Sequence, residues 1–245
     1  MVRKFSLVLS GGSALGFAHL GVIRFLEEED SLPSEIVGTS MGALVGAAYA
    51  KCLDFDVVYE FFKSKSYFRL FKPDVFSRGN LVSSDKIREE IEDFLEGFDF
   101  GDLMVDLKVV ATNSYTGESV VFDKSSGVSL VDALCASFSI PGVFKPYSIG
   151  SSSYYDGFLS SNLPFEFAKF RPFCSNVVNI NLIHDSSNSL GNLRQTIIYL
   201  VNNQNNLKMR RGVDLLDLDV SQFTLFDFHK IDELVDLGYR QAKGL

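Results

Sequence analysis

Ser40 stands in the sequence context of a nucleophile. Residues 38–42 read GTSMG, which matches the GxSxG pattern. In that pattern the serine lies on a tight turn from a strand into a helix, and the flanking glycines, here Gly38 and Gly42, allow close backbone approach. Apolar residues before Ser40 favour a buried strand over 35–38, and small residues after it favour a helix over 41–51. A glycine-rich turn with an incidental serine is the alternative interpretation.

A second glycine-rich segment could supply the electrostatic part of acyl transfer. Residues 10–16 read SGGSALG and lie between a predicted strand, 5–9, and a predicted helix, 17–29. Successive N–H groups in such a turn form a nest that binds anions. If the strands before the two loops are parallel neighbours, the loops lie side by side at one sheet edge. Free donors would then flank the Ser40 hydroxyl, where an oxyanion develops.

A dinucleotide site is the other functional interpretation of residues 10–16, and the sequence fits it poorly. Such a site requires glycine where Ser13 stands and an acidic residue at the end of the second strand. The acid in that strand, Glu35, stands at its beginning. We therefore predict no nucleotide cofactor.

The general base is either an aspartate or a histidine. Asp156 follows a predicted strand end, 153–155, and Ser40, Asp156 and His184 occur in the chain order of an α/β-hydrolase triad. Only one strand and one helix precede Ser40, fewer than that fold provides, which favours a Ser–Asp dyad. A buried carboxylate can accept the hydroxyl proton directly, and burial raises the pKa of an aspartate. His19 lies one helical turn from the first loop and could help to position it.

The elements that must position these residues predict a three-layer α/β/α sandwich with a mainly parallel central sheet. No linker or repeat interrupts the chain, so we expect a single domain over residues 1–245. The order of the strands does not follow from the sequence. Further helices are predicted over 84–95, 130–137, 190–211 and 229–243, and further strands over 107–112, 119–122, 177–183 and 216–220.

The ordered set of motifs resembles the patatin-like phospholipases. The resemblance spans about residues 5–164 and rests on SGGSALG at 10–16, GVI at 21–23, GTSMG at 38–42, ASFSIPGVFKP at 136–146 and DG at 156–157. It implies lipid acyl-ester hydrolysis of the phospholipase A or lysophospholipase type, without a metal or other cofactor. The residues implied are Ser40 as nucleophile, Asp156 as base, the N–H groups of Gly11, Gly12 and Ser13 as oxyanion donors, and Gly16, Gly38, Gly42 and Gly157 as supporting glycines.

Three positions depart from the family pattern. Ser13 stands where a third glycine is usual, Leu15 where a basic residue is frequent, and Phe158 where a small residue is preferred. Any residue except proline keeps its N–H, so Ser13 can still donate. These departures leave open a second function, that of a catalytically weak lipid-binding or regulatory homologue.

Composition excludes some partners and suggests others. A net charge of −8 argues against nucleic acid. The three cysteines, far apart, predict free buried thiols in a reducing compartment. No apolar run approaches the length of a membrane span, so we expect a cytoplasmic protein. Basic and aromatic residues interleave over 61–78, a pattern that suits peripheral contact with an anionic membrane or, alternatively, a packed helix with a basic edge.

Overall fold

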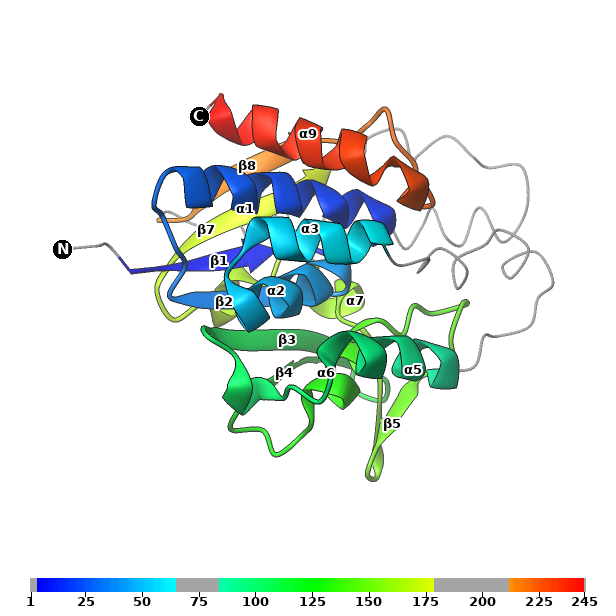
Figure 1. Ribbon diagram of the computed structural model, residues 1–245. Coiled ribbons are helices and arrows are strands. Elements are labelled where there is room, and N and C mark those ends of the chain that lie inside the picture. The colour runs from blue at the N-terminus through cyan, green and yellow to red at the C-terminus, as the bar shows by residue number, and fades with distance from the viewer. Residues whose placement is uncertain (1–3, 65–83, 179–211, 245) are drawn as a thin grey trace.

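One sheet organises the protein. The computed structural model describes residues 4–64, 84–178 and 212–244. Backbone pairing links the strands in the order β5-β6-β3-β2-β1-β7-β8, and β4 also pairs with β3 (Figure 1). Strands β3, β2, β1, β7 and β8 are parallel neighbours. The strands are β1 (Phe5–Leu9), β2 (Glu35–Thr39), β3 (Asp106–Asn113), β4 (Ser119–Phe122), β5 (Tyr147–Ile149), β6 (Ser152–Asp156), β7 (Arg171–Val178) and β8 (Asp214–Asp219).

Helices cover both faces of the sheet, which confirms the predicted three layers. Because side chains alternate along a strand, Leu7 and Leu9 of β1 face a large core on one side, while Val8 faces a smaller core with Leu163 and Cys174 on the other. The large core lies under α1 (Ala18–Glu28), α2 (Met41–Cys52), α3 (Phe55–Ser64), α5 (Ser84–Leu95), α6 (Leu130–Ser137) and α9 (Ile231–Lys243). The short α7 (Phe158–Ser161) ends two residues before Leu163, which lies on the opposite face.

Strand β3 pairs with two different strands, one after the other, along one of its edges. Val110 pairs with Thr39 of the parallel β2, and the next residue, Ala111, pairs with Asp156 of the antiparallel β6. The same two β3 residues pair with β4 on the other edge, so β2 and β6 lie end to end on one side of β3. This register brings the end of β6 directly to the end of β2.

Helices α1 and α9 pack with their backbones in contact. A Cβ atom added to Gly238 would lie 1.9 Å from the Ala18 carbonyl oxygen, and one added to Gly21 would lie 2.0 Å from that of Val235. Real Cβ atoms do not approach backbone so closely, so both positions require glycine. Figure 1 shows the two helices side by side over the sheet.

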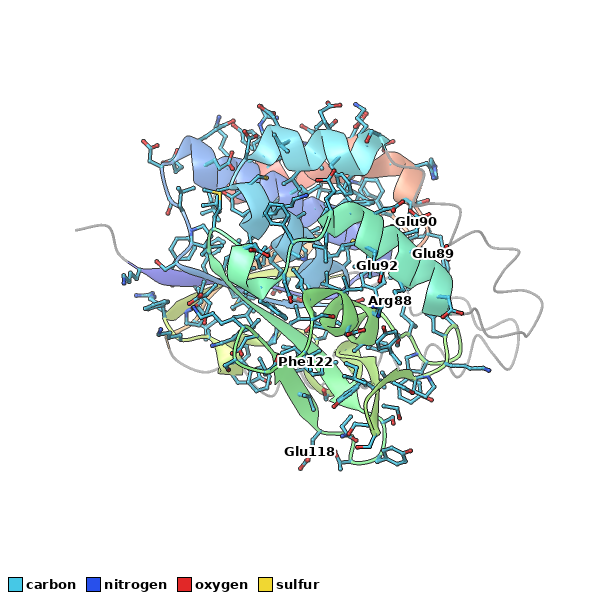
Figure 2. The ribbon with its side chains drawn as sticks, turned by 60° about the horizontal axis from the view of Figure 1, so that its bottom comes forward. Arg88, Glu89, Glu90, Glu92, Glu118 and Phe122 are labelled. Carbon is cyan, nitrogen blue, oxygen red and sulfur yellow. The ribbon has the colours of Figure 1, made fainter. Side chains whose placement is uncertain are left out.

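Arg88, labelled in Figure 2, ties α5 to its neighbours. Its guanidinium donates to Asp132 of α6 and to the Tyr147 hydroxyl of β5. The Tyr147 hydroxyl in turn donates to Asp132. Helix α5 is thereby fixed beside α6, whose last residue, Ser137, contacts the site described below.

Most predicted elements are present, with three differences. The predicted helix over 17–29 is preceded by a 3₁₀ turn, Ser13–Phe17, and α1 itself begins at Ala18. Strand β5 was not predicted from the sequence. Strand β7 begins at Arg171, six residues before the predicted strand over 177–183. The predicted helix over 190–211, the end of the predicted strand over 177–183, His184 and residues 65–78 lie outside the described residues. Of the cysteines, Cys135 and Cys174 are buried free thiols, whereas Cys52 is only half-buried.

Candidate active site

Ser40 lies at a strained turn between β2 and α2. Its backbone has φ 52° and ψ −125°, and it forms the N-cap of α2. A Cβ atom on Gly38 would lie 2.6 Å from the backbone of Ala43, and one on Gly42 would lie 2.4 Å from the Leu9 carbonyl oxygen. The two glycines of the motif therefore let the strand, the turn and the helix approach one another and the end of β1. This is the geometry that a GxSxG turn requires.

A side chain from α6 supports the turn. The Ser40 N–H donates to Ser137 Oγ at 2.8 Å, and the Ser137 hydroxyl donates to the Val110 carbonyl at 2.7 Å. Ser137 is fully buried. It therefore joins the Ser40 turn to β3, the strand that positions Asp156. Ser137 lies within the ASFSIPGVFKP segment at 136–146, but a serine at the end of a helix has no pattern of its own that marks it as a site residue.

The structure brings Asp156 to Ser40. The Ser40 hydroxyl donates to Asp156 Oδ2 at 2.7 Å, and the Phe158 N–H donates to Asp156 Oδ1 at 3.0 Å. The Asp156 backbone is fixed by the Ser139 carbonyl and the Thr112 hydroxyl. Asp156 is 1% exposed, and this burial raises its pKa to about 7 against the opposing effect of the two hydrogen bonds. A carboxylate with such a pKa is suited to accept a proton near neutral pH.

The glycine-rich loop presents two of its three predicted donors. The Gly11 N–H donates to the Asn162 carbonyl at 3.2 Å, so it already has a partner. Within residues 4–64, 84–178 and 212–244, the N–H groups of Gly12 and Ser13 have none. Gly11 itself lies against Ser40, since a Cβ at this position would be 3.2 Å from Ser40 Cβ. The loop therefore borders Ser40, and the N–H groups of Gly12 and Ser13 are its available donors within the described residues.

The loop is braced from the far end of the chain. Ser13 has φ 52°, a left-handed conformation in which glycine is the usual residue. Its hydroxyl donates to the Leu225 carbonyl at 2.8 Å, and the Ala14 N–H donates to the same oxygen at 3.2 Å. Serine thus keeps the conformation expected of a third glycine and adds a hydrogen bond that glycine cannot make.

The remaining supporting glycines also lie at close contacts. A Cβ on Gly16 would be 2.4 Å from Met41 Cγ, and one on Gly157 would be 2.3 Å from the Val110 carbonyl oxygen. Gly16 therefore lets the loop pack closely against the start of α2, and Gly157 lets the turn after Asp156 pack closely against β3.

The other two departures from the family pattern occupy different surroundings. Leu15 is 2% exposed and packs in the large core. Phe158 is half-buried, and its N–H supports the Asp156 carboxylate.

The histidines differ in their relation to the site. His19 is fully buried in α1, and it contacts the Ser10 carbonyl at 2.9 Å and Ser175 Oγ at 2.8 Å. Burial lowers its pKa to about 4. His229 is exposed, in the 3₁₀ turn before α9. His184 lies outside the described residues. Within the part of the chain that the structure describes, no histidine bonds to Asp156 or to Ser40.

The described residues contain no group of His, Cys, Asp or Glu side chains arranged to hold a metal ion. Among the same residues, no helix is both long enough and apolar enough to cross a membrane.

Comparisons with known proteins agree with the motifs. The family model described as patatin-like phospholipase matches residues 7–169. An uncharacterized NTE family protein of Mycobacterium tuberculosis is 31% identical over 163 residues, which are 66% of this chain and 44% of the relative. A patatin-like phospholipase domain-containing protein of Caenorhabditis elegans is 32% identical over 172 residues, 66% of this chain and 12% of that protein. The chain thus spans less than half the length of these curated relatives.

Solved structures share the fold at low sequence identity. VipD from Legionella pneumophila has a TM-score of 0.59 at 15% identity, over 99% of this chain and 66% of that chain. The type III effector protein ExoU has a TM-score of 0.52 at 15% identity, over 99% and 52% of the two chains. These similarities establish the architecture of the mixed sheet and its covering helices.

Proposed function

Because the chain belongs to the patatin-like phospholipase family, we propose that it is a serine acyl-ester hydrolase that acts on lipids through a Ser40–Asp156 dyad. The family supports lipid hydrolysis as the general activity. The observation that carries the proposal for this chain is the 2.7 Å hydrogen bond from the Ser40 hydroxyl to a buried carboxylate. A second support is the glycine-rich loop beside Ser40, with the N–H groups of Gly12 and Ser13 as oxyanion donors.

The proposed reaction has two steps. Ser40 Oγ attacks the ester carbonyl carbon while its proton passes to Asp156 Oδ2, and the carbonyl π electrons move to the oxygen. The N–H groups of Gly12 and Ser13, together with the positive end of α2, stabilise the resulting oxyanion. Collapse breaks the ester C–O bond, and the leaving alkoxide takes the proton from Asp156. Water then attacks the acyl-enzyme with Asp156 as base, which releases the fatty acid and restores Ser40.

Neutral esters and lysolipids are the proposed substrates. With Leu15 buried where relatives often carry a basic residue, the loop adds no positive charge at this position for a phosphate headgroup. Lysolipids have a separate support in a short relative match: lysophospholipase nte1 of Aspergillus fumigatus is 47% identical over 66 residues, which are 26% of this chain and 4% of that protein. Rates on p-nitrophenyl butyrate, lysophosphatidylcholine and phosphatidylcholine would rank the classes, and a clear preference for phosphatidylcholine would contradict this proposal.

The nucleophile is tested by one pair of variants. Ser40→Ala should abolish hydrolysis of p-nitrophenyl butyrate and labelling by a fluorophosphonate, with the melting temperature retained. Ser6→Ala is the matched control, because this fully buried serine donates to Glu35 at 2.6 Å near the start of β1, at the opposite end of the strand from the dyad. Near-normal turnover in Ser40→Ala would end the assignment.

The alternatives are separated by two further measurements. A wild-type protein that binds lipid vesicles but reacts with no fluorophosphonate would favour the lipid-binding homologue. If His184→Ala, correctly folded, is as inactive as Ser40→Ala, a triad of the α/β-hydrolase type replaces the dyad.

Membrane contact through residues 61–78 is a separate part of the proposal. Within the described start of this stretch, Phe62 is buried and Lys63 pairs with Asp232 at 3.2 Å, so this end is packed onto the protein. Helix α5 carries the acidic Glu89, Glu90 and Glu92 shown in Figure 2, which an anionic bilayer would repel. The proposed contact with an anionic membrane would therefore depend on Lys65, Arg69 and Lys72. Unchanged co-sedimentation with anionic vesicles after replacing these three by Gln would refute it.

A further inference from the structure

One peptide group of the glycine-rich loop is held on both of its sides. The carbonyl oxygen of Ser10 lies 2.9 Å from His19 Nε2, and the N–H of the same peptide, that of Gly11, donates to the Asn162 carbonyl at 3.2 Å. The two partners come from α1 and from the segment after α7. A peptide is planar, so two opposed bonds fix the rotation of this unit about the chain.

The partners of His19 determine its tautomer. A carbonyl oxygen only accepts hydrogen bonds, so His19 Nε2 must carry the proton that reaches Ser10. Nδ1 of the neutral ring is then an acceptor, and it receives the hydroxyl of Ser175, 2.8 Å away. Ser175 is fully buried on β7, and its own carbonyl accepts the Ser10 N–H at 3.1 Å. The ring therefore has one partner for each nitrogen as a neutral imidazole.

Fixing this peptide determines where the next two N–H groups lie. The Gly11 N–H is turned away to Asn162, and the N–H groups of Gly12 and Ser13 follow it in the chain. Because a change in one peptide plane propagates to the next, a freely rotating Ser10–Gly11 peptide would misdirect both donors. Oxyanion donors act through being held in place before the reaction.

We propose that His19 is a positioning residue for the oxyanion hole: its neutral ring holds the Ser10 carbonyl from α1 and so aims the Gly12 and Ser13 N–H groups at the oxyanion. This inference rests on the proposed function, since it assumes that Ser40 forms the tetrahedral intermediate. His19 touches neither the substrate nor Ser40, and it acts entirely through the loop backbone.

Three variants separate positioning from packing. His19→Leu removes the donor and retains an apolar side chain in the buried space. His19→Gln restores an amide donor for Ser10 and an acceptor for Ser175. Leu20→Ala is the control, because this fully buried neighbour in α1 destabilises the protein through packing alone.

We expect His19→Leu to lower kcat on p-nitrophenyl butyrate about 10- to 100-fold with little change in KM, because only transition-state stabilisation is lost. His19→Gln should recover at least half of this loss on a logarithmic scale. Leu20→Ala should lower the melting temperature and keep kcat within about twofold when assayed well below it.

A transition-state analogue gives a readout that packing does not move. An alkyl trifluoromethyl ketone forms a tetrahedral adduct with an oxyanion, whereas the matching methyl ketone binds without one. In His19→Leu the affinity for the trifluoromethyl ketone should fall by the same factor as kcat/KM, and the affinity for the methyl ketone should not change. Equal weakening of both ketones, or wild-type kcat in folded His19→Leu, would overturn the inference.

Failure of the proposed function would be seen separately. If Ser40→Ala stays active, or the wild type hydrolyses no ester, the dyad is refuted whatever His19 does. The geometric basis of the inference is still decided by ¹⁵N NMR of the imidazoles, with His19→Gln used to assign the resonance. The neutral Nε2–H tautomer at pH 7 supports it, and an Nδ1–H tautomer or an imidazolium refutes it.

Discussion

Ser137 Oγ accepts the backbone N–H of Ser40 at 2.8 Å, so a side chain from α6 holds the turn that carries the proposed nucleophile. We expect Ser137→Ala to leave this buried N–H without a partner. The Val110 carbonyl would also lose its hydrogen bond from the Ser137 hydroxyl. The free energy of unfolding should fall by about 1–3 kcal/mol. Because the strained Ser40 backbone would relax, kcat should fall by about tenfold or more.

Ser6→Ala is again the control for this prediction. Its buried hydroxyl donates to Glu35 and accepts the Phe170 N–H near the start of β1, so its loss should cost similar stability without a comparable fall in kcat. Urea denaturation and p-nitrophenyl butyrate kinetics measure the two effects. Equal kcat in the two variants would show that Ser137 does not position the nucleophile.

Asp156 should set the pH dependence of activity. Only the ionised carboxylate accepts the Ser40 proton, and its pKa is raised to about 7. The value of kcat/KM should therefore rise between about pH 5 and pH 8 and level off above it. In Asp156→Asn the amide oxygen should still accept the Phe158 N–H and the amide nitrogen should donate to Ser40 Oγ, so the variant cannot take the Ser40 proton and should lose about 10²-fold or more in kcat. A flat wild-type profile across this range would contradict Asp156 as the base.

The same carboxylate should reduce stability at neutral pH. Its folded pKa of about 7 lies above the unfolded value of about 3.9, so the folded state prefers the protonated form. The contribution of this raised pKa to the free energy of unfolding is fully present below about pH 4. It is lost as the pH rises through 7, which lowers the free energy of unfolding by about 4 kcal/mol. Asp156→Asn does not ionise, so its advantage over the wild type should grow from pH 4 to pH 7. Parallel urea stability curves would exclude this effect.

Ser13 exchanges backbone strain for a hydrogen bond. Ser13→Gly should remove about 1 kcal/mol of left-handed strain and lose about 1 kcal/mol with the bond to Leu225, for little net change. Ser13→Ala keeps the strain and loses the bond, so it should be less stable by about 1 kcal/mol. Both retain the N–H and should keep kcat/KM within several-fold. A higher melting temperature for Ser13→Ala than for Ser13→Gly would contradict this account.

Contact between α1 and α9 should be intolerant of a single methyl group. Gly238→Ala would place Cβ 1.9 Å from the Ala18 carbonyl, where neither helix backbone can yield without moving the other. We expect a loss of about 2 kcal/mol or more, by the cost typical of overpacking. Gly244→Ala is the matched control, because its nearest atom would be 3.5 Å away. Equal melting temperatures for the two variants would refute the prediction.

The first half of the site could be predicted because its signals are local. Residues 5–52 carry a strand, a glycine-rich turn, a helix and a second strand in sequence, and parallel neighbours place both turns at one sheet edge. The position of Asp156 beside Ser40 depends instead on the change of partner along β3, from Thr39 to Asp156. Neither strand order nor this register follows from periodicity.

The donors show a similar limit. The sequence identifies three consecutive N–H groups and cannot show that Gly11 is already bonded, because its partner is a backbone carbonyl, that of Asn162. Carbonyl partners such as those of Asn162 and Leu225 depend on chain path alone, and no residue type marks them. That residues 1–245 form one domain stays a prediction.

The brace at Leu225 has a consequence for biosynthesis. Ser40, Gly12 and Ser13 leave the ribosome early, whereas β7, which pairs with β1, and Leu225, which holds the loop, are translated long after them. A nascent chain therefore carries its proposed nucleophile well before the supports that would make it reactive. A chain stalled before residue 171 should resist fluorophosphonate labelling, and one stalled late enough to fold β8 and Leu225 should react. Translation order would in this way delay esterase activity until assembly.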